Sequence, residues 1–389
     1  MKTILHISAD FPDSLVPNKT KAVEWLIRET KGFRHVVYSL NRVSWRAGVA
    51  FQPFGEDRIA LAYGAPPYGL GLLSYLSPVA QAIATDLKQR AIVPDVIHAH
   101  KFAVDGVVAD LLAQQLAIPF ICNLWGHTDC KYFTSKPALR GFYRGLAGRA
   151  AFLIPPAPWT TDYFRENLGL DPSRLKMLPV ITAADDQIEP VVVGQPRLVT
   201  VFAWDSWQRK GLSMLSQAVA ALAPEMPGIT LDVYGRGGPK ALLDITRQLE
   251  KLDVGDRVTL CHALEHGKIQ ETVNRYAGFV LPSQPETYGM VYIEAVLAGV
   301  PILWSRNQGV AGLFENGQVG YGCDPQSLDD VIGGLRFIVN KEARLKAEIG
   351  LQQREGAFHH LRRAGISARY SELLSAALAR PFQAAASAA

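Results

Sequence analysis

Two glutamates eight positions apart stand in the segment PSQPETYGMVYIEAVLAGVPI, which covers residues 282–302. Glu286 belongs to a polar stretch with the composition of a loop, whereas Glu294 lies in a run that is otherwise almost wholly apolar. Burying a carboxylate costs on the order of several kcal/mol unless another group binds it. The apolar surroundings of Glu294 therefore predict a site in which another group binds its carboxylate.

Gly289 lies between the two acids, where a helix is expected to begin. The helix is expected to end at Ala298, because Gly299 suits the position after a helix and Pro301 cannot continue one. The first amides of a helix favour anions, and a glycine lets a phosphate rest against the backbone. A glutamate in the second turn leans back toward that end and can accept hydrogen bonds from sugar hydroxyls. The alternative is a first-turn acid and an unrelated structural glutamate.

Two basic residues follow another predicted strand, in the segment FAWDSWQRKGL (202–212). Arg209 and Lys210 directly precede Gly211. Fixed cations stabilise the negative charge that develops on a departing phosphate. A basic pair that opens a helix is also commonly solvated, so that alternative stays open.

The turn YGRGGPK (234–240) follows a strand and contains Gly235 and Gly237, which would let a ligand approach the backbone. A plain turn between a strand and a helix has the same composition. Elsewhere the sequence lacks GxxxxGK[ST], a GxGxxG turn after the first strand, HExxH and GxSxG. These absences argue against P-loop, hydride-transfer, zinc-protease and serine-hydrolase chemistry.

The elements that would position these residues are short apolar strands alternating with amphipathic helices. Strands are expected at 3–8, 35–40, 59–64, 95–100, 119–125, 151–156, 198–204, 229–235, 258–263, 278–283 and 301–305. Helices in the first half are expected at about 20–30, 76–90, 104–116 and 136–148. This alternation predicts an α/β protein of two Rossmann-like, doubly wound parallel-sheet domains, residues 1–190 and 195–365, facing across a ligand-binding cleft.

The composition indicates the cellular compartment of the protein and the kinds of partner that it is expected to bind. A net charge of +4 over 389 residues gives no reason to expect nucleic acid as a partner. The four cysteines have no zinc-type spacing, which favours a reduced, cytoplasmic protein. The first apolar stretch is too short for a signal peptide, no window approaches ~18 uninterrupted apolar residues, and the Ala-rich tail at 383–389 is expected to fray.

The segment 282–302 resembles the glutamate–seven residues–glutamate motif of retaining glycosyltransferases with the GT-B fold, particularly glycosyltransferase family 4. The resemblance extends over nearly the whole chain, including residues 94–129 and the glycine turn. It implies metal-independent transfer of a sugar, with retention of anomeric configuration, from a nucleotide-diphosphate donor to a glycan or lipid-linked acceptor. No cofactor is expected. Bacterial surface polysaccharide synthesis is carried over as the setting by analogy.

The resemblance also implies roles for residues of the glutamate motif. Glu286 is placed at the donor sugar, and Glu294 is placed on the ribose hydroxyls. The backbone at the sugar and diphosphate is that of Tyr288, Gly289, Met290 and Val291, and Thr287 is counted with these substrate-binding residues.

The cations and the N-terminal loop depart from the family pattern. Lys210 and the following glycine match a Lys-Gly pair that contacts the diphosphate. The family's arginine falls on Asp205, so Arg209 is the candidate to replace it. The family often has a Gly-Gly loop after the first strand, but residues 11–26 contain no glycine. Lys19 is the polar candidate there, together with its neighbours.

Histidines follow two strands of the first half. Alternation along the strand places His98 and His100 on one face, and His100 is retained as a substrate contact although either could be a core residue. The family commonly has a histidine and a glycine after the next strand, which makes Gly126 and His127 candidates for contact with the donor sugar or the acceptor. No metal site is predicted, because His127 lacks further ligands at suitable spacing.

The region from Lys131 to Arg149 contains basic residues and no acidic one. A helix at 136–148 with this composition suits an anionic membrane surface or a lipid-diphosphate acceptor, and a solvated face is the alternative. By resemblance, residues 366–380 are expected to form a helix that crosses back to the first domain.

Two rival functions stay open. A GT-B sugar-nucleotide epimerase would need additional acids and bases at the sugar, and no clear set is present. A non-catalytic nucleotide-sugar binding protein is suggested by the missing arginine and the missing Gly-Gly loop.

Overall fold

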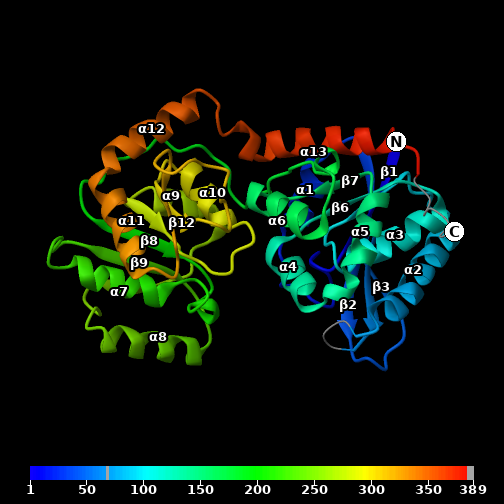
Figure 1. The fold of residues 1–389 in the computed structure, drawn as a ribbon, viewed down its shortest axis with the longest axis horizontal. Coiled ribbons are helices and arrows are strands. Elements are labelled where there is room, and N and C mark those ends of the chain that lie inside the picture. Colours follow the sequence, from blue (N-terminus) through cyan, green and yellow to red (C-terminus); the bar gives the residue numbers. More distant parts are fainter. Residues whose placement is uncertain (67–69, 383–389) are drawn as a thin grey trace. The chain divides into compact units, whose positions relative to one another are not determined.

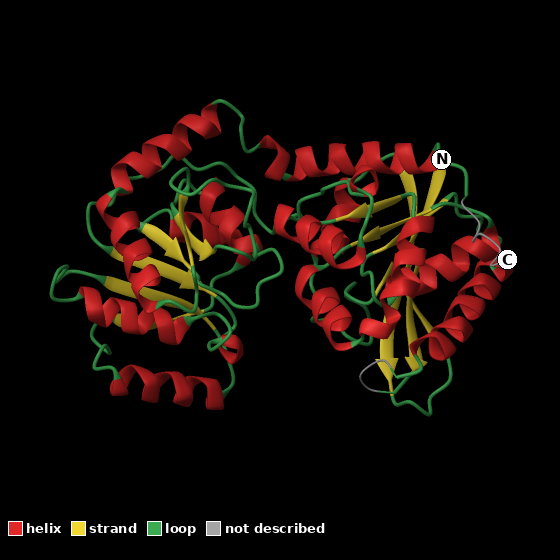
Figure 2. Ribbon diagram, in the orientation of Figure 1, coloured by secondary structure: helices red, strands yellow, loops and turns green. Residues whose placement is uncertain are grey.

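The computed structural model describes residues 1–66 and 70–382, and the Ala-rich tail lies outside the described residues. The chain divides into two compact units (Figure 1). The first unit consists of Met1–Ile181 together with the segment that starts at Arg363, and the second is Thr182–Arg362. Each unit is built around a parallel sheet with helices on both faces (Figure 2). The predicted fold class is therefore confirmed.

The first sheet has the strand order β3-β4-β2-β1-β5-β6-β7, and all strands except the antiparallel edge strand β3 run parallel. The strands are β1 (Lys2–Ser8), β2 (Phe33–Val43), β3 (Ala50–Gly55), β4 (Arg58–Gly64), β5 (Val96–Ala99), β6 (Phe120–Asn123) and β7 (Phe152–Ile154). Without β3, this is the order of a dinucleotide-binding sheet, whose winding reverses between β1 and β5. Loops that leave these two strands diverge, and such a switch point is where α/β sheets bind ligands.

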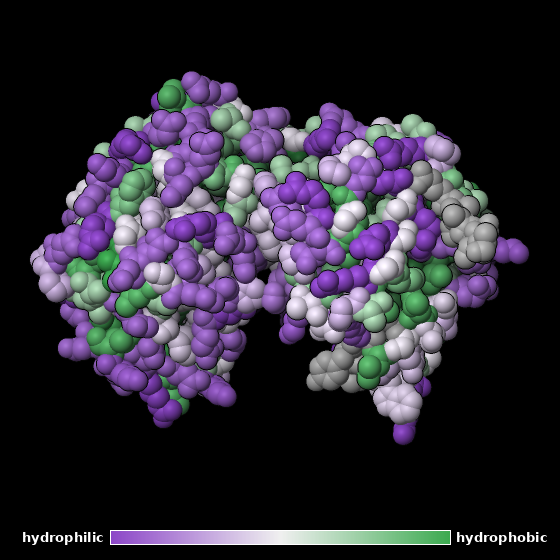
Figure 3. Space-filling model, viewed as in Figure 1, coloured by the Kyte–Doolittle hydropathy of each residue, from purple (hydrophilic) through white to green (hydrophobic). Residues whose placement is uncertain are grey.

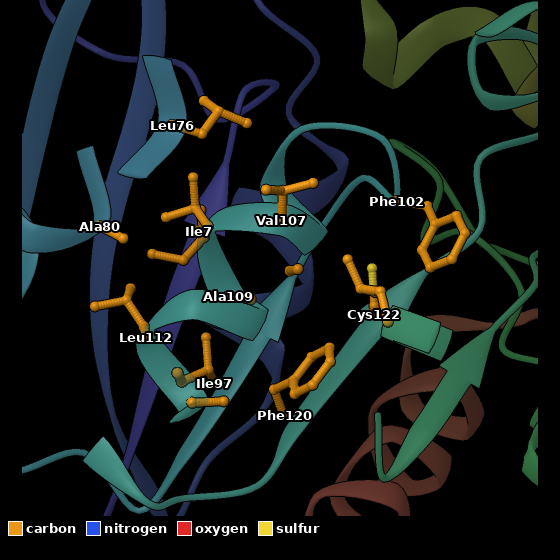
Figure 4. Packing of buried hydrophobic residues seen from close by; sticks show 14 of the residues in the cluster. Ile7, Leu76, Ala80, Ile97, Phe102, Val107, Ala109, Leu112, Phe120 and Cys122 are labelled. Atoms are coloured by element: carbon orange, nitrogen blue, oxygen red, sulfur yellow. The ribbon is translucent and has the colours of Figure 1, made fainter. Parts of the chain in front are cut away.

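Helices cover both faces of the first sheet. The first-unit helices are α1 (Ala22–Glu29), α2 (Leu72–Gln89), α3 (Asp105–Leu116), α4 (Gly126–Ser135), α5 (Arg140–Arg149), α6 (Pro158–Leu168) and α13 (Arg363–Leu378). On one face, side chains such as Ile7, Leu112 and Phe120 form a continuous core under α2 to α6 (Figure 4). On the other, Ile4 and Leu374 belong to a second core under α1 and α13. Because both faces of the sheet are covered, every residue of β1 except Lys2 is buried.

The first unit differs from the prediction in several details. β3 was not predicted, because its side chains are mostly exposed and leave no apolar pattern. The helix expected at 136–148 begins only at Arg140, since Pro137 opens a separate 3₁₀ turn, Pro137–Leu139. α4 was also missed, because its sequence GHTDCKYFTS has little apolar periodicity.

The second sheet has six parallel strands in the order β10-β9-β8-β11-β12-β13, which again is the dinucleotide-binding order. The strands are β8 (Arg197–Val201), β9 (Thr230–Gly235), β10 (Val258–His262), β11 (Gly278–Val280), β12 (Ile302–Ser305) and β13 (Gly320–Cys323). The helices are α7 (Leu212–Leu222), α8 (Pro239–Lys251), α9 (Ile269–Val273), α10 (Met290–Leu297), α11 (Leu328–Asn340) and α12 (Glu342–Arg354). β13 was not predicted: Gly320 approaches Ile302 so closely that a Cβ would lie 1.9 Å from its carbonyl oxygen, and glycine hides the strand pattern.

The boundary between the units lies earlier than the predicted boundary near residues 190–195. Residues 182–196 belong to the second unit although they form no helix or strand. The amide of Ile188 donates to the carbonyl of Leu297, and the amide of Val193 donates to the carboxylate of Glu342. These bonds join residues far apart in sequence, so composition alone did not reveal them.

Most side chains on the face shown in Figure 3 are hydrophilic, and the apolar ones form small separate patches. Within residues 1–66 and 70–382, no helix combines the length and the hydrophobicity that are needed to cross a bilayer.

Candidate active site

The two loops that carry the predicted acids and cations leave neighbouring strands of the second sheet. The loop after β8 contains Arg209 and Lys210, and the loop after β11 contains Glu286. β8 pairs with β11 in parallel, and β9 lies on the other side of β8. The winding of the sheet reverses between β8 and β11, so both loops lie at its switch point.

Hydrogen bonds fasten these two loops to each other. The backbone amide of Gln284 donates to the carbonyl of Arg209 at 2.7 Å. The guanidinium of Arg209 donates to the carbonyl of Pro285 at 3.2 Å. Two loops whose bonded residues lie 76 positions apart in the sequence are thus held together.

Lys210 and Glu286 form the closest charge pair of the site. The ammonium nitrogen of Lys210 lies 2.5 Å from the carboxylate of Glu286, and their side chains are 15% and 10% exposed. The amide of Glu286 donates to Oε1 of Gln308 at 2.6 Å, and its second carboxylate oxygen accepts from the amide of Thr287 at 3.1 Å. Charge-assisted bonds of this kind hold both side chains in a defined place. Gln308 was not predicted, because nothing in its local sequence marks it.

Gly289 stands at the N-terminus of α10, as the sequence indicated. Its backbone is left-handed, with φ +77° and ψ 67°, and a Cβ there would lie 2.4 Å from the ring of Tyr292. Among the described residues, the amides of Met290 and Val291 have no acceptor, as is usual in a first helical turn. The helix end therefore presents free donors beside the Lys210–Glu286 pair, with Tyr288 buried behind it.

Glu294 is buried in α10, but its carboxylate already has a protein partner. Oε1 of Glu294 accepts from the backbone amide of Ala183 at 3.1 Å, in the segment that leads into the second unit. The idea that only ribose hydroxyls stabilise this carboxylate is therefore wrong. Since one oxygen holds a loop in place, Glu294 has a structural contact in addition to its expected role at the ribose.

Replacing Glu294 with alanine is expected to lower the free energy of unfolding by about 1–3 kcal/mol, because the amide of Ala183 loses this acceptor. Glu294→Gln keeps an acceptor oxygen and is expected to recover most of that stability while losing the charge. Urea unfolding of both variants measures the difference. Equal destabilisation by alanine and glutamine would contradict a role for the Ala183 bond.

Packing contacts within the second unit account for the glycines in the turn after β9. A Cβ on Gly235 would lie 2.1 Å from the carbonyl oxygen of Phe202, and one on Gly237 would lie 2.8 Å from Cβ of Trp204. These glycines are thus needed to pack against the loop after β8, and their role in ligand approach stays a prediction. Asp205, at the position of the family's arginine, accepts from the amide of Gly238 at 3.1 Å. Arg209 is exposed, and its guanidinium is the second cation of this loop.

Four of the predicted site residues belong to the first unit. Lys19 already has partners within the unit, since its ammonium lies 2.9 Å from both the buried carboxylate of Asp13 and the hydroxyl of Ser39, and its contact with a substrate stays a prediction. Gly126 is required by packing, since a Cβ there would lie 2.2 Å from the ring of Trp159. His127 is exposed in the first turn of α4.

His100, the fourth of these residues, is buried in a histidine cluster.

Asp129, two residues after His127 in α4, was not assigned a role from the sequence. It is buried, accepts from the amides of Trp125 and Ala103, and so fastens α4 to the loop after β5. Burial raises the pKa of Asp129 to about 7.

Several cations of the Lys131–Arg149 region have partners within the first unit. Arg144 donates to the carbonyl of Leu168, and Arg149 pairs with Asp110 at 2.7 Å. Lys131 is exposed. The break at Pro137 also interrupts the single basic helix that was expected. Docking of this region on a membrane stays a prediction.

The comparison with known proteins decides the family. Residues 22–180 match the glycosyl transferase 4-like domain, and residues 185–355 match glycosyl transferases group 1. The two matches meet at the boundary between the units. The chain belongs to the group 1 glycosyl transferases. The predicted family is thereby confirmed, because each unit of this glycosyltransferase matches one of the two domain models.

Individual relatives are distant. The glycosyltransferase is 25% identical over 301 residues to a glycogen synthase of Mycobacterium tuberculosis, covering 75% of this chain and 69% of that protein. It is 25% identical over 261 residues to the putative teichuronic acid biosynthesis glycosyltransferase TuaC of Bacillus subtilis, covering 63% and 62%. The solved structure of HepE from Anabaena in complex with UDP aligns with a TM-score of 0.68 at 17% identity, covering 96% and 100%. The last likeness concerns the fold alone.

Proposed function

We propose that this glycosyltransferase moves a sugar from a nucleotide-diphosphate donor to a glycan or lipid-linked acceptor, with retention of anomeric configuration and without a metal. The observation that carries the proposal is the Lys210–Glu286 pair beside the Gly289 end of α10. This arrangement combines a cation, a carboxylate and free backbone donors at the switch point of the second sheet.

In the proposed reaction, the bond between the anomeric carbon and the phosphate oxygen breaks, and negative charge grows on the diphosphate. Lys210, Arg209 and the first amides of α10 stabilise that charge. Glu286 orients the donor sugar, and the carboxylate of Glu294 accepts hydrogen bonds from the ribose hydroxyls. The acceptor hydroxyl attacks from the face that the diphosphate leaves, and its proton passes to the leaving phosphate. His127 is the proposed contact at the sugar or the acceptor.

The proposed setting is bacterial surface polysaccharide synthesis with a UDP-type donor. Two similarities support it: TuaC is described as a teichuronic acid biosynthesis glycosyltransferase, and HepE is seen with UDP. The sequence similarity to TuaC covers less than two thirds of either chain.

A thermal-shift screen with UDP-, GDP-, ADP- and dTDP-sugars is expected to identify one stabilising donor, because binding to the folded state raises its melting temperature. Turnover of that donor is then followed by proton NMR, where the anomeric coupling of the product reports its configuration. Reactions with and without EDTA are expected to run at the same rate. Inversion of configuration, or loss of activity in EDTA, would contradict this mechanism.

A non-catalytic donor-binding protein is the second candidate. The observation that favours it is Asp205, which stands where the family has an arginine and instead accepts from Gly238. Binding of a donor without transfer or slow hydrolysis, over a broad panel of acceptors, would select this function over the transferase.

A further inference from the structure

Four histidines gather at the switch point of the first sheet, within the first unit. His6 lies on β1, His35 on β2, and His98 and His100 at the end of β5. The ring centroids of His98 and His100 are 3.9 Å apart, and His6 stacks on His100 at 5.3 Å. Except for His35, these side chains are buried. The proposed transfer reaction uses none of them beyond the predicted contact of His100.

Hydrogen bonds arrange three of these rings in a directed chain. Nε2 of His35 lies 2.9 Å from the carbonyl oxygen of Thr30, which can only accept, so this nitrogen carries the proton. In a neutral ring the other nitrogen is an acceptor, and Nδ1 of His35 lies 2.9 Å from Nε2 of His6. By the same step, Nδ1 of His6 accepts from Nε2 of His100 at 2.9 Å.

This series of hydrogen bonds from Thr30 to His100 leaves Nδ1 of His100 without a proton. Burial lowers the pKa of His6 and His100 well below the usual value, which keeps both rings neutral. His98 has its own partners, since Asn123 Oδ1 accepts from its Nε2 at 2.9 Å and the hydroxyl of Tyr370 donates to its Nδ1 at 2.6 Å. The open acceptor of the cluster is therefore Nδ1 of His100.

Nδ1 of His100 is buried and has no hydrogen-bond partner among the described residues. The same holds for the indole nitrogen of Trp125, which can only donate. Both residues line one pocket of about 30 Å³, whose other walls are largely apolar. A buried acceptor and a buried donor without partners are costly, and two residues with such atoms at one pocket indicate a missing polar group.

We propose that this pocket binds an alcohol: a ligand hydroxyl donates to Nδ1 of His100, and the indole N–H of Trp125 donates to an oxygen of the same ligand. A hydroxyl is the smallest group that both donates and accepts. The volume suits a hydroxyl with the carbon that bears it, and the apolar walls suit that carbon. This inference goes beyond the proposed transfer reaction and does not rest on it.

A metal ion is the competing occupant, because one nitrogen from each of His6, His98 and His100 lies within 4.8 Å of the others. The hydrogen bonds favour the alcohol. Both ring nitrogens of His6 and both of His98 already have partners, so a metal would have to displace several of these bonds.

The direction of the chain is tested by long-range proton–nitrogen NMR on the full-length protein labelled with [15N]histidine. Nδ1 of His100, assigned with a His100→Gln variant, is expected to be unprotonated at neutral pH. His35→Phe removes the acceptor for His6 and is expected to give a mixture of His100 tautomers. His35→Asn keeps an acceptor near the former Nδ1 and is expected to restore the single tautomer. A protonated Nδ1 in the unaltered protein would overturn the proposal.

The ligand is tested with 2-propanol and acetone, which have the same number of heavy atoms but differ in the hydroxyl donor. Saturating shifts of the His100 Nδ1 resonance are expected with 2-propanol, and acetone is expected to bind about tenfold more weakly or worse. Trp125→Phe is expected to weaken 2-propanol binding. Equal binding of the two probes, or binding of neither, would refute alcohol recognition.

A third titration uses Zn²⁺. A stoichiometric complex that shifts His6, His98 and His100 together would make the cluster a metal site and overturn the proposal, whereas unchanged histidine signals support it. None of these measurements needs sugar transfer, so their failure and a failure of the proposed function can be told apart.

Discussion

Replacing Glu286 with glutamine is expected to lower the rate of sugar transfer by about 100-fold or more, while the melting temperature changes little. Glutamine keeps the size of the side chain and an acceptor oxygen for Lys210, which lies 2.5 Å away. It removes the negative charge that orients Lys210 and faces the donor sugar in the proposed reaction, and such interactions act mainly in the transition state. Initial rates at saturating donor measure the effect.

The matched control is Glu225→Gln in the same unit. Glu225 pairs with Arg336 at 2.7 Å, but both side chains are largely exposed. Exposed pairs contribute little to folding, so this variant is expected to transfer sugar at the normal rate. A Glu286→Gln protein as active as the control would refute the placement of Glu286 at the reacting sugar.

Replacing Gly289 with alanine is expected to lower the free energy of unfolding by about 2–4 kcal/mol and to weaken donor binding about tenfold or more. A φ of +77° is unfavourable for any residue with a Cβ, and the new Cβ would lie 2.4 Å from the ring of Tyr292. Relief of that clash must move the first turn of α10, whose amides are proposed to hold the diphosphate. Urea unfolding and titration with the preferred nucleotide sugar measure the two effects.

Gly333→Ala is the control for this substitution. Gly333 lies in α11, where an added Cβ meets nothing within 4 Å. Alanine there is expected to stabilise the protein by about 0.5–1 kcal/mol and to leave donor binding unchanged. If Gly289→Ala behaved in the same way, α10 would not be the diphosphate site.

The sequence predicted elements whose signals are local. The buried strand β11 is an apolar run, and the start and end of α10 are marked by Gly289 and Gly299, both with positive φ. Parallel strands buried on both faces have long apolar stretches, and the fold class followed from their alternation with helices. β3 and β13 were missed because one is exposed and the other is rich in glycine.

The site was predictable only in part, because the decisive contacts are made between distant segments. The Lys210–Glu286 pair was not predicted as a contact, although both residues were singled out. Asp205 accepts from the turn after β9, Gly237 packs against Trp204, and Lys19 is held by Asp13. Residue type and spacing do not distinguish a polar side chain that binds a ligand from one that another loop occupies.

The position of α13 has a consequence for synthesis of the chain on the ribosome. The second unit is continuous from Thr182 to Arg362, so all of its strands can pair once that stretch has emerged. The first unit must wait, because Tyr370 of α13 is bonded to His98, 272 residues earlier. Until then the face formed by Ile4 and Val96 lacks the part of its cover that α13 supplies. The unit that is synthesised first is thus the last to be completed, and a nascent chain released before residue 363 would expose an apolar face to chaperones.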